Sequence, residues 1–159
     1  MNLVTVDPYN KSLKYKLIAF QNNISTKLDF LDKYEKISKE KTKEDYEKEK
    51  INSNDIFEVI ATLKDDEVNN LCYFKGTRDN KFIEMNLINV NGKITKPFIN
   101  IASDYAFNNL DAETVTIFSN NIKEDLLISL GYQSLGMYRN KDTYVKDRKD
   151  YKELGSVVK

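Results

Sequence analysis

The spacing of apolar positions changes along the chain, and each change marks a different kind of element. In the N-terminal part, apolar residues recur every three to four positions, which is typical of a helix that buries one face. This spacing predicts a helical region over residues 24–50, capped by Ser25 or Thr26. The residues expected on its inward face are Leu28, Leu31, Tyr34 and Ile37, with Phe30 beside it. The charged run at 39–50 has mixed signs and is interpreted as a solvated helix surface or as a partner-binding face.

From Ile56 onward the apolar positions alternate as in β-strands. Residues 56–63, 71–75 and 82–88 predict three strands joined by short polar turns, an antiparallel meander. A helical period returns at 96–109, where Pro97 suits the first turn and Thr95 or Lys96 the cap. The expected elements after it are a strand at 115–117, a helix opened by an Asn121/Glu124 capping box and closed by Gly131, and a hairpin of strands at 134–138 and 143–146.

The predicted order of elements is therefore α-α-β-β-β-α-β-α-β-β. A helix between the third and fourth strands requires a parallel crossover within a sheet that is otherwise antiparallel. Neither an internal repeat nor a linker rich in Pro, Gly and Ser divides the chain. We therefore expect a single α+β domain over residues 1–159, with a mixed, mostly antiparallel sheet flanked by helices.

Composition removes several classes of chemistry. The 159 residues include no His, one Cys and five Gly, so Ser-His-Asp triads, His-ligated metals, zinc fingers and the usual glycine-rich nucleotide loops are absent. No metal site is predicted. Net charge is zero, and the basic stretch 146–152 is interrupted by Asp, which argues against nucleic-acid binding. No apolar run approaches the ~18 residues of a membrane span, and no secretory signal is recognised, so we expect a cytoplasmic protein.

One C-terminal segment carries a family resemblance. A strand at 115–118 leads to Asn120, and a helix follows that ends at Gly131-Tyr132, eleven residues after Asn120. This segment, within the element order of residues 55–147, resembles the GNAT superfamily of acyl-CoA-dependent N-acyltransferases. The resemblance implies a GNAT-like fold and transfer of an acetyl group from acetyl-CoA to an amine, either a small molecule or a protein. A homodimer is also compatible with it.

The resemblance also suggests site residues. Glu84 would act as the base through a water molecule, since some family members place their base on this strand. Strand alternation puts Phe82, Glu84, Asn86 and Ile88 on one face, and a carboxylate among apolar neighbours at mid-strand is expected to have a raised pKa. The alternative is a carboxylate that faces solvent or pairs with a Lys. The acetyl-CoA contacts implied by the family are Ile88 and Val90 for the pantetheine arm, Gly92, Lys93, Thr95 and Lys96 for the pyrophosphate, and Asn120.

The sequence departs from the family pattern in two places. Lys93 and Thr95 stand where the pyrophosphate loop usually has glycines, so residues 92–96 are either a charged phosphate site or a plain turn. Leu127 stands where the family often has a general-acid Tyr. Tyr138 or Cys72 is a conceivable substitute, whereas Tyr132 is expected in the core. Two hypotheses therefore remain: an N-acetyltransferase of unidentified acceptor, or a catalytically silent binding or regulatory protein on the GNAT fold.

Overall fold

The computed structural model describes residues 2–88, 94–118, 122–138 and 141–151. The N-terminal part contains β1 (Asn2–Val6), α1 (Lys11–Ile24), α2 (Asp29–Glu40) and α3 (Lys43–Asn52). The rest contains β2 (Asp55–Lys64), β3 (Glu67–Thr77), β4 (Phe82–Ile88), α4 (Lys96–Asn108), β5 (Thr114–Phe118), α5 (Glu124–Ser129), β6 (Gln133–Tyr138) and β7 (Lys141–Asp147).

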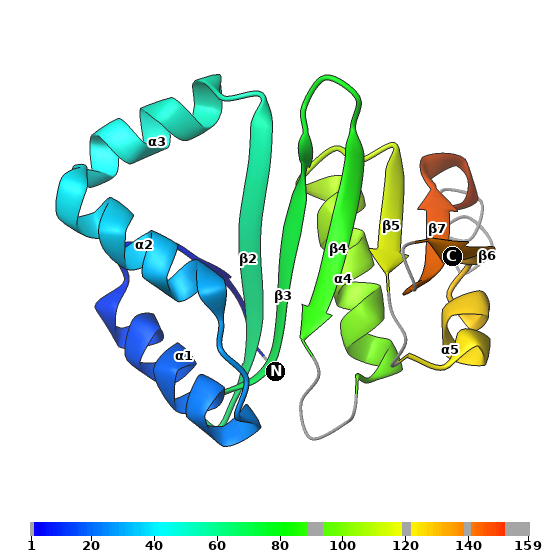
Figure 1. Cartoon of the computed structure of the whole chain (residues 1–159), viewed down its shortest axis with the longest axis horizontal. Coiled ribbons are helices and arrows are strands. Elements are labelled where there is room, and N and C mark those ends of the chain that lie inside the picture. The colour runs from blue at the N-terminus through cyan, green and yellow to red at the C-terminus, as the bar shows by residue number, and fades with distance from the viewer. Residues whose placement is uncertain (1, 89–93, 119–121, 139–140, 152–159) are drawn as a thin grey trace.

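The strands form one seven-stranded sheet in the order β1-β2-β3-β4-β5-β7-β6 (Figure 1). Among the described strands, five of the six neighbouring pairs are antiparallel, and only β4 and β5 run parallel. This parallel pair is the crossover that the helix between the third and fourth predicted strands requires. The predicted α+β class with a mixed, mostly antiparallel sheet is confirmed.

Helices cover both faces of the sheet, and each face has its own core. Figure 1 shows α4 behind β4 and β5, with α1 and α2 on the side of β1 and β2. The core under α4 includes Phe74, Ile83, Met85, Phe98 and Phe107. The core under α1 and α2 includes Leu17, Phe20, Phe30, Tyr34 and Val59. Neighbouring residues of β4 alternate between the two faces, so its side chains either enter the α4 core or point to the α1/α2 side.

The N-terminal region contains more structure than the sequence pattern indicated. The predicted helical region contains α2 and α3, while β1 and α1 were not expected. The predicted cap at Ser25 or Thr26 is wrong, because Ser25 ends α1 with a left-handed φ of 53°. Leu28 precedes α2 without a side-chain cap, and Gln21 Oε1 accepts a hydrogen bond from the Leu28 N–H at 2.7 Å.

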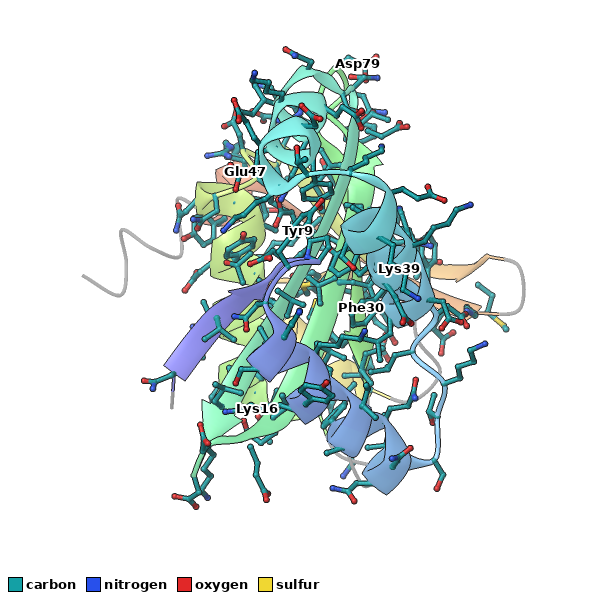
Figure 2. All side chains as sticks on the ribbon, turned by 90° about the vertical axis from the view of Figure 1, so that its left-hand side faces the viewer. Tyr9, Lys16, Phe30, Lys39, Glu47 and Asp79 are labelled. Atoms are coloured by element: carbon teal, nitrogen blue, oxygen red, sulfur yellow. The ribbon has the colours of Figure 1, made fainter. Side chains whose placement is uncertain are left out.

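The charged helix α3 lies on the surface. None of its residues is buried, and Lys48 pairs with Glu44 at 3.3 Å with the i,i+4 spacing. Lys50 forms an ion pair with Glu58 of β2, which ties the end of α3 to the sheet. Figure 2 shows Lys39 and Glu47 among many charged side chains that project from α2 and α3. The helix is therefore exposed, as both the solvated surface and the partner-binding face require.

The predicted starts of α4 and α5 have different outcomes: the N-cap of α4 is confirmed and that of α5 is wrong. Thr95 is the N-cap of α4, as predicted, although its side chain makes no capping hydrogen bond. The N-cap of α5 is Lys123, so the capping box led by Asn121 is wrong, and Asn121 itself lies outside the described residues. Gly131 follows α5 with φ 91°, a conformation that glycine adopts without strain and that ends the helix as predicted. Among the described helices, none combines the length and apolar character of a membrane span.

Candidate active site

The parallel strands β4 and β5 pair over a short stretch and then separate. Their register joins Phe82, Ile83 and Glu84 to Thr114, Val115 and Thr116, although β4 continues to Ile88 and β5 to Phe118. Figure 1 shows the two strands diverging toward their C-terminal ends. Among the described residues, the facing backbone edges beyond Glu84 have no partner in the opposite strand. Such edges offer N–H and C=O groups to an extended ligand.

Glu84 is the last paired residue of β4 and therefore stands where the strands separate. It lies on the α1/α2 side of the sheet, opposite Lys75 of β3 and Thr116 of β5. The side chain is half-buried, and Asn86 Nδ2 donates a hydrogen bond to Glu84 Oε2 at 3.1 Å. Among the described residues no Lys or Arg lies within ion-pair distance of Glu84. Within the part of the chain that the structure describes, Glu84 is thus not paired with a Lys, and its neighbours on this face include the polar residues Lys75, Thr116 and Asn86.

The N-terminus of α4 lies at the same end of the sheet as the C-termini of β4 and β5 (Figure 1). The first backbone hydrogen bond of the helix runs from the Ile99 N–H to the Thr95 carbonyl at 3.1 Å. Helix geometry leaves the N–H groups of Lys96 and Phe98 without an acceptor in α4, and Pro97 has no N–H to offer. The Lys96 side chain is exposed. The start of α4 thus offers two free amide N–H groups, the positive end of the helix dipole and the Lys96 ammonium near the separating strands.

The predicted contact residues fall into two groups. Ile88, the last residue of β4, lies at the end of the sheet where Thr95 and Lys96 begin α4, and it packs against the α1/α2 core, whereas Glu84 lies four residues earlier on β4. The remaining predicted contacts lie outside the described residues, namely Val90, Gly92, Lys93 and Asn120. The roles of all eight residues remain predictions.

Leu127 of α5 and Tyr132 just after the helix belong to the core. Leu127 is fully buried, so the place of the family's general acid is occupied by an aliphatic side chain. Tyr132 is 1% exposed, as expected for a core residue, and its hydroxyl hydrogen-bonds Ser103 Oγ at 2.6 Å. Burial raises the pKa of Tyr132 well above its usual value. The side chain of Tyr138 lies outside what the structure describes.

Cys72 is fully buried between β2 and β4, and burial raises the pKa of its thiol. A thiol without solvent access cannot exchange protons with a leaving group at the surface, so Cys72 is not a substitute acid. We expect a thiol-specific reagent such as Ellman's reagent to leave the native protein unlabelled at pH 8 and to label one thiol per chain in denaturant. Rapid labelling of the native protein would contradict this burial.

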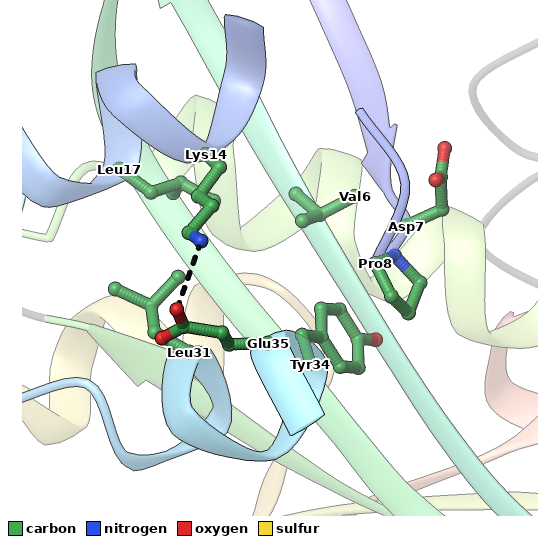
Figure 3. A pocket seen from close by; sticks show the side chains of 8 residues that line it. All are labelled: Val6, Asp7, Pro8, Lys14, Leu17, Leu31, Tyr34 and Glu35. Atoms are coloured by element: carbon green, nitrogen blue, oxygen red, sulfur yellow. Dashed lines mark ion pairs between the residues drawn. The ribbon is translucent and has the colours of Figure 1, made fainter. Parts of the chain in front are cut away.

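A small cavity lies between β1, α1 and α2, lined in part by Val6, Leu17 and Tyr34 (Figure 3). Lys14 Nζ and Glu35 Oε1 form an ion pair 3.6 Å long across its rim. Its volume of ≈ 10 Å³ has room for about one water molecule, so it is too small for an organic substrate.

Solved structures, but neither family models nor curated proteins, relate the chain to known proteins. No protein-family model matches the sequence, and no curated protein matches it either. An aminoglycoside 6'-acetyltransferase type Ii is similar in structure, at 13% identity over 92% of this chain and 97% of its own, with a TM-score of 0.59. A spermidine N-acetyltransferase from Vibrio cholerae is similar at 12% identity over 98% of this chain and 99% of its own, with a TM-score of 0.61.

A third similar structure is an N-acetyltransferase from Campylobacter jejuni in complex with acetyl coenzyme A. It is 13% identical, covers 92% of this chain and 99% of its own, and has a TM-score of 0.58. Identities this low show a shared fold. The protein therefore has the GNAT fold, as the element order and the segment around Gly131 predicted.

Sequence reasoning did not include every residue around Glu84. Asn86 was placed on the same face, but its hydrogen bond to the carboxylate was not anticipated. Lys75 and Tyr73 of β3 lie opposite Glu84 and Asn86, respectively. Strand alternation could have put Lys75 and Tyr73 on one face of β3, but the register that brings them beside Glu84 follows only from the structure.

Proposed function

We propose that the protein is an N-acetyltransferase that moves an acetyl group from acetyl-CoA to an amine. The observation that supports this most is the position of Glu84, a half-buried carboxylate at the point where β4 and β5 separate. The structural neighbours named above are N-acetyltransferases, and one is in complex with acetyl coenzyme A. The acceptor would be a small amine or an amino group of a protein.

The reaction requires a base from the protein but no protein nucleophile, because the amine itself attacks the thioester. The amine nitrogen attacks the thioester carbonyl, a C–N bond forms and the C–S bond breaks. The proton leaves the nitrogen for Glu84, directly or through a water, and the electron pair of the broken bond leaves with the thiolate. A thiol pKa of about 8.5 makes the thiolate a tolerable leaving group, so the buried Leu127 does not prevent the reaction.

The described residues suit the co-substrate in part. Lys96 and the two free amides at the start of α4 provide donors and positive charge for a pyrophosphate. The backbone of Ile88 would contact the pantetheine arm at the open edge of β4. Acetyl-CoA supplies the activated acetyl thioester, while the chain supplies binding, orientation and the base.

The first test is equilibrium binding of acetyl-CoA and of CoA, measured by isothermal titration calorimetry. We expect dissociation constants below 1 mM for wild type, on the basis of charge-assisted hydrogen bonds to phosphate. Lys96→Met should weaken both ligands about tenfold, because it removes one charged donor. Lys43→Met, at an exposed lysine that begins α3 in the N-terminal helical region, is the control. Binding weaker than millimolar would exclude an acetyl-CoA enzyme.

A catalytically silent binding protein on the same fold is the second candidate. It is favoured by one observation, the buried aliphatic Leu127 at the position where the family often has its acid. This candidate expects no acetyl transfer to a broad amine panel even where acetyl-CoA binds. Turnover that is lost in Glu84→Gln would exclude it.

A further inference from the structure

An aromatic and charged surface adjoins Glu84 on the α1/α2 side of the sheet. It consists of Phe57 of β2, Tyr73 and Lys75 of β3, Glu84 of β4, and Lys33 of α2, and we call it the amine-side surface. The Phe57 and Tyr73 rings lie 5.9 Å apart between centroids, and both are half-buried at the margin of the α1/α2 core. The surface therefore has an apolar floor with charged groups above it.

Two of the charged groups are lysines that lie over this floor. Lys33 Nζ is 4.4 Å from the centroid of the Phe57 ring, and Lys75 Nζ is 5.4 Å from that of Tyr73. Both lysines are exposed, and neither forms an ion pair with another described residue. Lys75 stands directly opposite Glu84 across the strands, yet its ammonium contacts the ring. The two ammonium groups therefore have no anionic partner within the described protein.

Negative charge lies at the same surface. The pKa of the Tyr73 hydroxyl is raised by burial first and then by the charges of Glu84 and Asp29, so both carboxylates act on the ring that Lys75 covers. Asp29 is one helical turn before Lys33 on α2. The hydroxyl of Tyr73 thus stays protonated at neutral pH and is able to donate a hydrogen bond. The surface presents positive and negative groups side by side.

From this arrangement we infer that the acceptor is an amine that also carries an anionic group, a carboxylate or a phosphate. This inference rests on the proposed acetyl transfer at Glu84. The ammonium of the acceptor would be drawn to Glu84, and its anionic group to Lys75 and Lys33. A polycationic acceptor would instead be repelled by Lys33 and Lys75, which have no ion pair among the described residues, so its binding near Glu84 is disfavoured.

Strand spacing sets the distance between the two groups of the acceptor. Lys75 lies on the strand next to that of Glu84, directly opposite it. Phe57 lies one strand further in the same row, and the Lys33 ammonium lies over its ring. Neighbouring strands are about 4.8 Å apart, so the backbone positions of Lys75 and Phe57 lie about 5 and 10 Å from that of Glu84, and we expect an amine-to-anion separation of this order. An amino sugar with a phosphate or carboxylate substituent meets this requirement.

The test compares three probes with one common ring: glucosamine, glucosamine 6-phosphate and muramic acid, which carries a carboxylate. Equilibrium binding to the full chain is measured by calorimetry without acetyl-CoA, and acetyl transfer is measured separately. We expect at least one anionic probe to bind about tenfold more tightly than glucosamine, since a hydrogen bond between charged groups has about this effect. Which anion is preferred identifies the substituent. Equal binding of all three would overturn the inference.

Substitutions then test whether Lys75 and Lys33 cause the preference for an anionic probe. Lys75→Met should remove most of the preference for an anionic probe over glucosamine, and Lys33→Met should remove part of it. The binding of glucosamine itself should be unchanged in both variants. Lys64→Met is the matched control, because Lys64 is also an exposed lysine of the sheet but lies at the opposite end of β2 from Phe57. An equal loss in Lys64→Met would indicate general charge attraction and would overturn the assignment.

The two readouts separate this inference from the proposed function. Selective binding without acetyl transfer would reject the N-acetyltransferase and keep the anionic-amine site. Acetyl transfer to glucosamine and glucosamine 6-phosphate at equal kcat/KM, unchanged in Lys75→Met, would reject the site and keep the enzyme.

Discussion

Glu84→Gln is expected to lower kcat for acetyl transfer by about 10²- to 10⁴-fold, the usual contribution of a positioned general base. Glutamine keeps the size of the side chain and an oxygen that accepts the hydrogen bond from Asn86 Nδ2, but it does not take up a proton. The dissociation constant for acetyl-CoA should stay unchanged, because Glu84 lies on the acceptor side. Steady-state kinetics with the best amine of a panel, together with calorimetry, measures both quantities.

Glu67→Gln serves as the matched control for this substitution. Glu67 is an exposed carboxylate at the first position of β3, far along the strand from Lys75 and its partner Glu84. Its replacement should leave kcat and KM unchanged. If Glu84→Gln is as active as Glu67→Gln, the base is another group and Glu84 is a surface carboxylate.

The largest effect on stability is expected for Phe74→Ala. Phe74 is fully buried near the middle of β3, and its ring stacks on that of Tyr105 with centroids 5.5 Å apart. Removing a buried phenyl ring loses its transfer free energy and leaves a cavity, so the free energy of unfolding should fall by about 3–5 kcal/mol. Urea unfolding followed by circular dichroism measures this change.

Phe82→Ala is the corresponding control on the neighbouring strand. The side chain of Phe82 is 58% exposed, so its removal leaves no cavity and should cost less than about 1 kcal/mol. A loss for Phe74→Ala no larger than that for Phe82→Ala would mean that the core under α4 is not packed as described.

The fold could be predicted from sequence where periodicity and helix stops are strong. The three-strand meander, the helix begun at Thr95 and the stop at Gly131 all have local signals, and the crossover follows from their order. The helix α1 also has such signals, because Asn10 caps it and Leu13 and Leu17 share its inward face, but they were overlooked. The short edge strand β1 has only five residues, and most of them are exposed, so its pattern is weak.

The candidate site was predictable to a smaller extent. Alternation along β4 placed Glu84 and Asn86 on one face, and the family resemblance suggested Glu84 as the base. The row from Phe57 through Lys75 to Glu84 depends on the register of three strands, and register is a property of the assembled sheet. Lys33 joins this row from α2, which is more than twenty positions away in the sequence. Spacing along one chain segment does not show such a contact.

The short pairing between β4 and β5 also bears on how the chain folds. The hairpin of β2 and β3 closes through the two-residue turn of Asp65 and Asp66, so its contacts form between close neighbours in sequence. The β4–β5 seam joins residues about thirty positions apart and gains only three backbone pairs for that loop closure. The β1–β2 pair closes a longer loop, over 53 to 61 positions, but gains five pairs for it. Among the described residues the seam is thus the junction of the sheet with the fewest paired residues. The separation that opens the sheet to a ligand therefore leaves this junction with little backbone pairing to offset its loop closure.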